Sequence, residues 1–166
     1  MIGFLTGKLI SSKPTQILLD VNGVGYTVNI SINTFEKISE KETVSLFIHT
    51  SVKEDSITLF GFFTQSEKEM FELLISISGI GPKVSLGILS GISVDDLKDA
   101  IASGNVSRLI AIPGIGRKTA ERVVLELRNK VDAIKADGSI KITSAKDEAI
   151  SALATLGYQR QLSEKV

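Results

Sequence analysis

The sequence predicts an α+β protein of several small domains: an N-terminal OB-fold β-barrel, a central all-α tandem helix-hairpin-helix domain and a small C-terminal helical domain. Three observations predict it. Apolar and polar residues alternate through the first 63 positions, helical spacing starts at Ser66, and one ten-residue motif occurs twice in the helical part. The expected bounds are 1–63 for the barrel, 64–131 for the tandem domain, 132–143 for a flexible linker and 144–166 for the C-terminal domain.

The barrel is predicted from short alternating runs separated by turn residues. Asn22-Gly23 favours a type I′ hairpin between ILLDV and VGYTVNI, since both turn positions need positive φ. The polar tip 53–56 is expected to turn a second hairpin ahead of SITLFGFF. Five or six such strands are typical of an OB-type barrel. Two runs carry the alternation: Val24, Tyr26, Val28 and Ile30, and then Val44, Leu46 and Ile48.

The helical part is predicted from a change of period to 3.6 residues. Ser66, followed three positions later by Glu69, matches a capping box and predicts where the first helix begins. Further helices are expected at 94–102 and 117–131. The last of these has one apolar stripe for packing, with Lys118 and Arg122 together outside it.

The remaining residues predict little packed structure. Segment 132–143 lacks periodicity and contains Asp137-Gly138-Ser139, which favours a flexible linker. A short amphipathic helix follows and is expected to end at Gly157. Because about 22 residues bury little core alone, we expect 144–166 to be an incomplete domain.

Composition narrows the classes of function. The chain has no Cys and a single His49, which excludes a disulfide framework, a thiolate nucleophile and Cys or His metal clusters. No apolar run is long enough to span a membrane, so we expect a cytoplasmic protein without membrane contact, metal or cofactor. Formal net charge is zero, yet 108–130 carries six basic and two acidic side chains. The positive charge is therefore local, as in a binding patch.

The repeat is the most specific feature of the sequence. LISISGIGPK at 74–83 and LIAIPGIGRK at 109–118 are identical at seven of ten positions, at an offset of 35 residues. Such self-similarity predicts one supersecondary unit used twice. In each copy an apolar stretch enters Gly-Ile-Gly, and Ile80 and Ile115 are expected to plug the hairpins into the core. The glycines are Gly79, Gly81, Gly114 and Gly116.

The chemistry expected of this unit is phosphate binding. Glycines bring backbone N–H groups close to a ligand, and a helix start offers unpaired donors with the positive end of its dipole. A single copy could equally be a plain turn, whereas a basic residue at the same place in both copies favours phosphate. Groups aimed at phosphate position a protein without reading base sequence. The candidate side chains are Lys83, Arg117, Lys118 and Arg122.

The chain resembles the RuvA family of Holliday junction-binding subunits over essentially its whole length. The resemblance is carried, in order, by MIGFLTGKL, VKEDSITLFGF, SGIGPKVSLGILS and PGIGRKTAERVVLELRNK. It implies a non-catalytic homotetramer, with an octamer left open, that holds four-way DNA junctions open during recombination and DNA repair. It also implies an AAA+ ATPase partner, RuvB, engaged by the C-terminal domain, and a resolvase, RuvC, that can share the DNA.

The resemblance also assigns a role to the hairpin tip at Glu54 and Asp55 as an acidic pin. From the residues alone, a solvated turn is the simpler interpretation. As a pin, two carboxylates per subunit near the junction centre would repel phosphates and disfavour a continuous duplex across the middle.

Two other classes of function remain open. Helix-hairpin-helix units accompany nucleases and glycosylases, for which Glu54-Asp55, Asp95-Asp96 or Lys118 could be proposed as reactive groups. Adjacent acids are usually solvated or favoured by a helix start, and no phosphate-binding P-loop motif for ATP occurs. An OB barrel can instead bind single strands through stacked aromatics, but this barrel carries five basic and six acidic residues.

Overall fold

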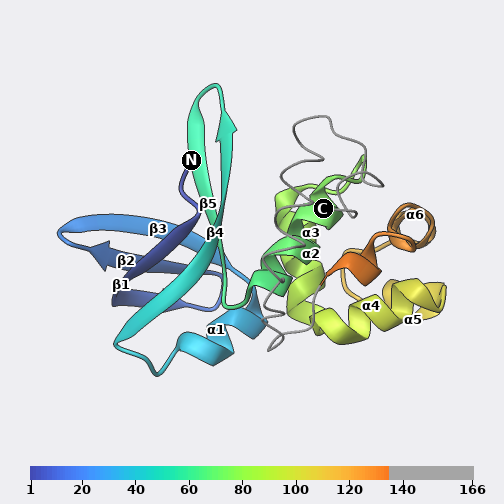
Figure 1. Cartoon of the computed structure of the whole chain (residues 1–166), viewed down its shortest axis with the longest axis horizontal. Coiled ribbons are helices and arrows are strands. Elements are labelled where there is room, and N and C mark those ends of the chain that lie inside the picture. Colours follow the sequence, from blue (N-terminus) through green and yellow to red (C-terminus); the bar gives the residue numbers. More distant parts are fainter. Residues whose placement is uncertain (135–166) are drawn as a thin grey trace, which may run out of the picture.

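The computed structural model describes residues 1–134 as a β-barrel followed by a group of helices (Figure 1). This architecture confirms the predicted barrel and tandem helical region. Residues 135–166, which include most of the expected linker and the whole expected C-terminal domain, lie outside the described part. The strands are β1 (Phe4–Lys13), β2 (Gln16–Val21), β3 (Val24–Ile30), β4 (Thr43–Lys53) and β5 (Ser56–Phe62). The helices are α1 (Ile32–Ile38), α2 (Gln65–Ile75), α3 (Pro82–Gly91), α4 (Val94–Ala102), α5 (Val106–Ile110), α6 (Arg117–Leu127) and the 3-10 turn η1 (Val131–Ala133).

The five strands close in the order β1-β2-β3-β5-β4, with β3 and β5 parallel and every other pair antiparallel. The predicted Asn22-Gly23 hairpin is confirmed, because φ is 53° at Asn22 and 88° at Gly23, and Val21 pairs with Val24. Alternate residues of β4 fill the barrel as predicted. Val44, Leu46 and Ile48 are each at most 3% exposed.

The β4–β5 hairpin extends beyond the barrel wall (Figure 1). β4 pairs with β1 only as far as Phe47, and β5 pairs with β3 only from Leu59, whereas β4 and β5 continue to Lys53 and Ser56. The outer part is therefore a two-stranded ribbon without a third strand. Its turn consists of Glu54 and Asp55, as the polar tip predicted.

Helix α1, which lies between β3 and β4, was not predicted from the sequence. Ser31 caps it by accepting the Thr34 N–H at 3.0 Å. The Asn33 side-chain amide donates to the carbonyls of Leu89 at 2.7 Å and Ile92 at 3.3 Å. Contacts with α3 thus hold this seven-residue helix, and through it the barrel is fixed to the helical region.

The start of α2 differs from the predicted capping box. Thr64, not Ser66, is the N-cap, and its hydroxyl accepts the Glu67 N–H at 3.2 Å. The Glu67 carboxylate in turn accepts the Phe63 N–H at 2.9 Å. The same four-residue signature occurs at 64–67 and at 66–69, and Glu67 has additional partners on α1 that fix the earlier start.

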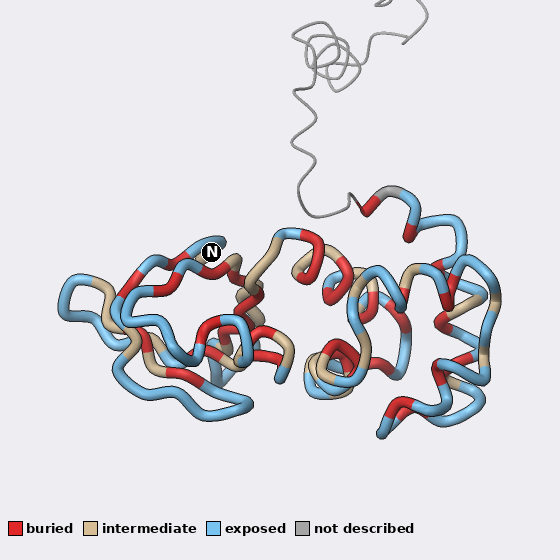
Figure 2. The backbone as a smooth tube through the Cα atoms, turned by 90° about the horizontal axis from the view of Figure 1, so that it is seen from below, coloured by how far each residue is buried: buried red, intermediate tan, exposed pale blue. Residues whose placement is uncertain are grey.

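The helices enclose a second core, separate from that of the barrel (Figure 2). Phe60 and Phe62 extend from β5 into it, and the Phe62 ring lies 4.8 Å from that of Phe71. The predicted helix at 94–102 is observed as α4, whereas α6 ends at Leu127, earlier than predicted. Ile134 is 4% exposed in this core, and its carbonyl accepts from Lys98 Nζ at 2.8 Å. Within residues 1–134 no helix is long and apolar enough to cross a membrane.

Candidate nucleic-acid interface

The two Gly-Ile-Gly segments form hairpins with the same backbone hydrogen bonds. Ile80 N–H donates to Ile77 O at 3.0 Å in the first, and Ile115 N–H donates to Ile112 O at 3.1 Å in the second. Ile80 and Ile115 are 4% and 6% exposed, which confirms that they plug the hairpins into the helical core. The repeat in the sequence is therefore a repeat in structure.

The two glycines of each hairpin differ in conformation. Gly79 and Gly114 have a φ of +89°, where a side chain would be strained. Gly81 and Gly116 lie at φ of −93° and −82°, so only the first glycine of each pair has a positive φ. A Cβ added at Gly81 or Gly116 would meet nothing within 4 Å. The second glycine of each hairpin is therefore not required by backbone strain. Its lack of a side chain leaves the backbone open to close approach by a ligand.

Each second glycine is also the N-cap of the next helix. Gly81 begins α3 and Gly116 begins α6, and neither has a side chain to cap the first turn. The first N–H groups of a helix lack intrahelical partners, and the positive end of the dipole lies there. Pro82 occupies the first turn of α3, so the first hairpin presents one donor fewer. Both hairpins nevertheless present N–H groups at an exposed surface.

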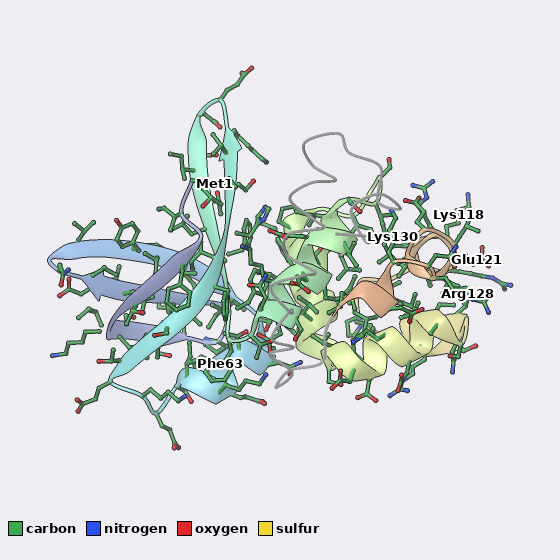
Figure 3. All side chains as sticks on the ribbon, viewed as in Figure 1. Met1, Phe63, Lys118, Glu121, Arg128 and Lys130 are labelled. Atoms are coloured by element: carbon green, nitrogen blue, oxygen red, sulfur yellow. The ribbon has the colours of Figure 1, made fainter. Side chains whose placement is uncertain are left out.

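The predicted basic side chains surround these helix starts. Lys83 and Lys118 are exposed at equivalent places, and neither makes a hydrogen bond or ion pair within residues 1–134. Arg117 pairs with Glu121 at 2.9 Å. Figure 3 shows Lys118 and Glu121 on the part of the helical region farthest from the barrel. Within the described chain, one unpaired lysine is thus available to an anion at each hairpin, Lys83 at the first and Lys118 at the second.

Arg122 has a contact that the sequence did not indicate. Its Nη1 donates to the carbonyl of Ser78 at 2.6 Å, across 44 residues of chain. Ser78 directly precedes Gly79, so this arginine of the second repeat contacts the first hairpin. A second, weaker contact joins Arg122 Nε to Glu126 at 3.9 Å.

The acidic tip lies in a different part of the molecule from the hairpins. Glu54 and Asp55 are exposed at the end of the β4–β5 ribbon, and neither has a hydrogen bond or ion pair in the described chain. The ribbon stands away from the helices in Figure 1. The structure therefore does not bring the tip together with Gly79, Gly114 and their neighbours within one subunit.

Of the acidic residues considered for catalysis, Asp96 has structural partners. Asp96 accepts from the Ser93 hydroxyl at 2.7 Å and from Arg108 at 2.6 Å, and both partners hold the pKa of that carboxyl below its usual value. His49 Nδ1 lies 3.0 Å from Glu72 Oε1 and so joins β4 to α2. Among the described residues, no three His, Cys, Asp or Glu side chains are grouped to hold a metal ion.

Comparison with known proteins agrees with this arrangement. Residues 1–61 match the RuvA N terminal domain, and residues 71–129 match the SAM-like helix-hairpin-helix tandem. The chain is 52% identical to the Holliday junction branch migration complex subunit RuvA of Geobacter sulfurreducens, over 100% of this chain and 87% of that protein. It is 51% identical to the RuvA of Geotalea daltonii over 99% and 87%, and 44% identical to that of Christiangramia forsetii over 100% and 88%. The chain belongs to the RuvA family of Holliday junction branch migration complex subunits.

Proposed function

We propose that this chain is a non-catalytic subunit that binds four-way DNA junctions by their shape and holds them open for branch migration. The observation that supports this most is the matched pair of hairpins. Each presents uncapped helix N–H groups beside an exposed lysine, Lys83 or Lys118, at equivalent positions. This arrangement offers two equivalent sites for phosphates of DNA.

The proposed contact is electrostatic and carries no base information. Backbone amides of Gly79, Gly81, Gly114 and Gly116 approach the sugar-phosphate chain, because no Cβ keeps it at a distance. Lys83, Arg117, Lys118 and Arg122 add positive charge around the same chain. Each neutralised phosphate releases counterions, so the affinity should fall steeply as salt is raised.

Selectivity for a junction is assigned to the acidic tip. A homotetramer, or a pair of them as an octamer, would collect the ribbons of its subunits near one axis, with Glu54 and Asp55 from each. Phosphates of a continuous duplex would be repelled from that axis, whereas an open junction leaves it free. The 1–63 barrel would thus select the shape of the DNA, and the 64–131 domain would hold its arms.

The motor activity is proposed to come from a partner. The relatives are named as subunits of a branch migration complex, which supports an AAA+ ATPase, RuvB, engaged through segment 144–166 beyond the 132–143 linker. The resolvase RuvC is proposed to act on the same junction, and the complex to work in the cytoplasm. The C-terminal segment lies outside the described residues, so this part rests on the family.

One competition experiment separates the classes of function. A labelled four-way junction bound by the protein is challenged with unlabelled junction, duplex or single strand of the same base composition. The proposal requires the unlabelled junction to compete best, and stronger competition by single strands would reject it. Strand cleavage or base release in Mg²⁺ would favour an enzyme. Light scattering with and without junction reports the number of subunits in the same samples.

A further inference from the structure

The hydrogen bond between Arg122 and Ser78 fixes a peptide plane in the first hairpin. The Ser78 carbonyl and the Gly79 N–H belong to one planar trans unit, in which they point in opposite directions. With the carbonyl bonded to Arg122 Nη1 at 2.6 Å, the Gly79 N–H points away from α6. That N–H makes no hydrogen bond of its own in the described chain.

The second hairpin lacks the equivalent contact. The repeat offset of 35 residues places Pro113 at the position of Ser78 and Gly87 at the position of Arg122. Gly87 has no side chain, and a Cβ added there would meet nothing within 4 Å. Instead, Gly87 and Pro113 both line a groove of about 660 Å³, which Lys83 also borders. The two hairpins thus share their backbone hydrogen bonds, but within residues 1–134 only the first is held by an arginine side chain from the other repeat.

We propose that Arg122 is a positioning residue that fixes the first hairpin to α6 and aims the Gly79 N–H at the DNA backbone. This inference rests on the proposed function of the hairpins in DNA binding. Arg122 contributes mainly through Gly79 and Lys83 of the other repeat, whereas Lys118, one turn earlier on α6, contributes by direct charge. The hydrogen bond thereby links the first hairpin directly to the helix that follows the second hairpin.

The chemistry of the contact favours this role. A guanidinium donates through a planar fork, so one N–H can hold a carbonyl in a defined direction. The bond is charge-assisted and short. Arg122 is half exposed, and its remaining N–H groups can still approach a phosphate. Removal of the Arg122 side chain should therefore change the first hairpin as well as the surface of α6.

The first test uses the full chain without DNA. Arg122→Met keeps most of the side-chain stem but removes the donor, and Lys118→Ala is the matched loss of one charge on the same helix. The ¹³C shift of the Ser78 carbonyl and the amide shift of Gly79 are measured by NMR, with Gly114 as internal reference. We expect both to move in Arg122→Met alone, while Gly114 stays in place. Unchanged shifts would show that the contact is not made in solution.

The second test asks which lysine Arg122 acts with. Junction affinity is measured for Arg122→Met, Lys83→Ala, Lys118→Ala and the two double variants, each checked for folding by its melting curve. For Arg122→Met with Lys83→Ala, we expect the loss of junction affinity to be at least about threefold smaller than the product of the two single losses. For Arg122→Met with Lys118→Ala, we expect the loss to be close to that product. Coupling to Lys118 alone, or multiplicative losses in both pairs, would reject positioning.

These outcomes separate the inference from the function on which it rests. If neither Lys83→Ala nor Lys118→Ala weakens DNA binding, the proposed function is wrong, and the positioning role for DNA fails with it. If Lys83→Ala weakens binding but its loss of affinity simply multiplies with that of Arg122→Met, only the inference is wrong. Rescue of the Ser78 carbonyl shift and of affinity by Arg122→Lys would support the contact itself, because an ammonium can also donate to that carbonyl.

Discussion

Glu67 Oε1 lies 2.6 Å from Lys37 Nζ, and this ion pair joins α1 beside the barrel to the first turn of α2. The carboxylate is 8% exposed and also accepts from the Thr34 hydroxyl at 3.1 Å and the Phe63 N–H at 2.9 Å. Glu67→Ala should therefore lower the free energy of unfolding by about 3 kcal/mol, because it leaves buried donors without partners. Urea denaturation measures the loss.

Lys37→Ala is the companion variant, and its effect should be about 1 kcal/mol. The Lys37 side chain is 43% exposed, so water replaces much of the pair, and Glu67 keeps its two other donors. Equal losses for the two variants in urea would mean that the ion pair, and not the hydrogen-bonded carboxylate, holds the barrel to the helices.

Two glycines of the helical region should respond in opposite directions to a methyl group. Gly114→Ala places a side chain at φ of +89° and should destabilise the protein by about 1–2 kcal/mol. Gly87→Ala lies inside α3 with open space around the new Cβ and should stabilise it by about 0.5–1 kcal/mol. Thermal melting of both variants checks the direction of each change in stability. A melting temperature for Gly114→Ala equal to that of wild type would contradict the hairpin geometry.

Local sequence signals predicted much of the fold. Asn22-Gly23 needs only the two flanking strands to specify its turn, and the alternation of β4 needs only an inside and an outside. The Gly-Ile-Gly repeat likewise predicted both hairpins and their buried isoleucines. In each case the residues that determine the structure are neighbours in the chain.

What the sequence did not predict depends on distant contacts. Helix α1 has seven residues, too few for a clear period, and the Asn33 bonds to Leu89 and Ile92 that hold it span more than 50 residues. Two overlapping capping signatures could not be ranked without the partners of Glu67 on α1. Arg122 was expected on a free face of its helix, and only the folded chain brings Ser78 against it.

Asp96 should give the protein a defined sensitivity to acid. Its pKa is lowered by hydrogen bonds from Ser93 and Arg108 and by the charge of Arg108. A carboxyl with a depressed pKa stabilises the fold above its unfolded value and loses that contribution as pH falls through its folded value. Asp96→Asn should therefore lower the melting temperature at pH 7, and the difference from wild type should shrink as the pH falls through the depressed pKa of Asp96.

The matched control for this prediction is Asp95→Asn, in the same first turn of α4. Asp95 makes no hydrogen bond or ion pair in the described part of the chain. Its variant should change the melting temperature less at pH 7. A difference between Asp96→Asn and wild type that persisted unchanged at low pH would rule out the ionised carboxylate as the cause.

Loss of the phosphate contacts should change salt dependence before it changes selectivity. Lys118→Ala should weaken junction and duplex binding by similar factors and reduce the slope of log affinity against log salt by about 1. The Lys118→Ala, Arg122→Ala double variant should weaken both further and flatten the slope more. Fluorescence anisotropy between low and moderate salt measures it, with the exposed barrel variant Lys8→Ala as control. A slope unchanged in the double variant would place the phosphates elsewhere.

Neutralising the ribbon tip should have the opposite pattern, with selectivity lost and affinity kept. Glu54 and Asp55 are exposed at a two-residue turn, so Glu54→Gln with Asp55→Asn should leave the fold intact. Without two carboxylates per subunit to repel phosphates, the preference for junction over duplex should fall about fivefold, as expected for roughly 1 kcal/mol of repulsion. Glu40→Gln with Glu42→Gln removes the same charge from exposed positions before β4, and that variant should keep its preference. Paired titrations of junction and duplex decide between them, because an equal fall in both double variants would reflect net charge and not a pin.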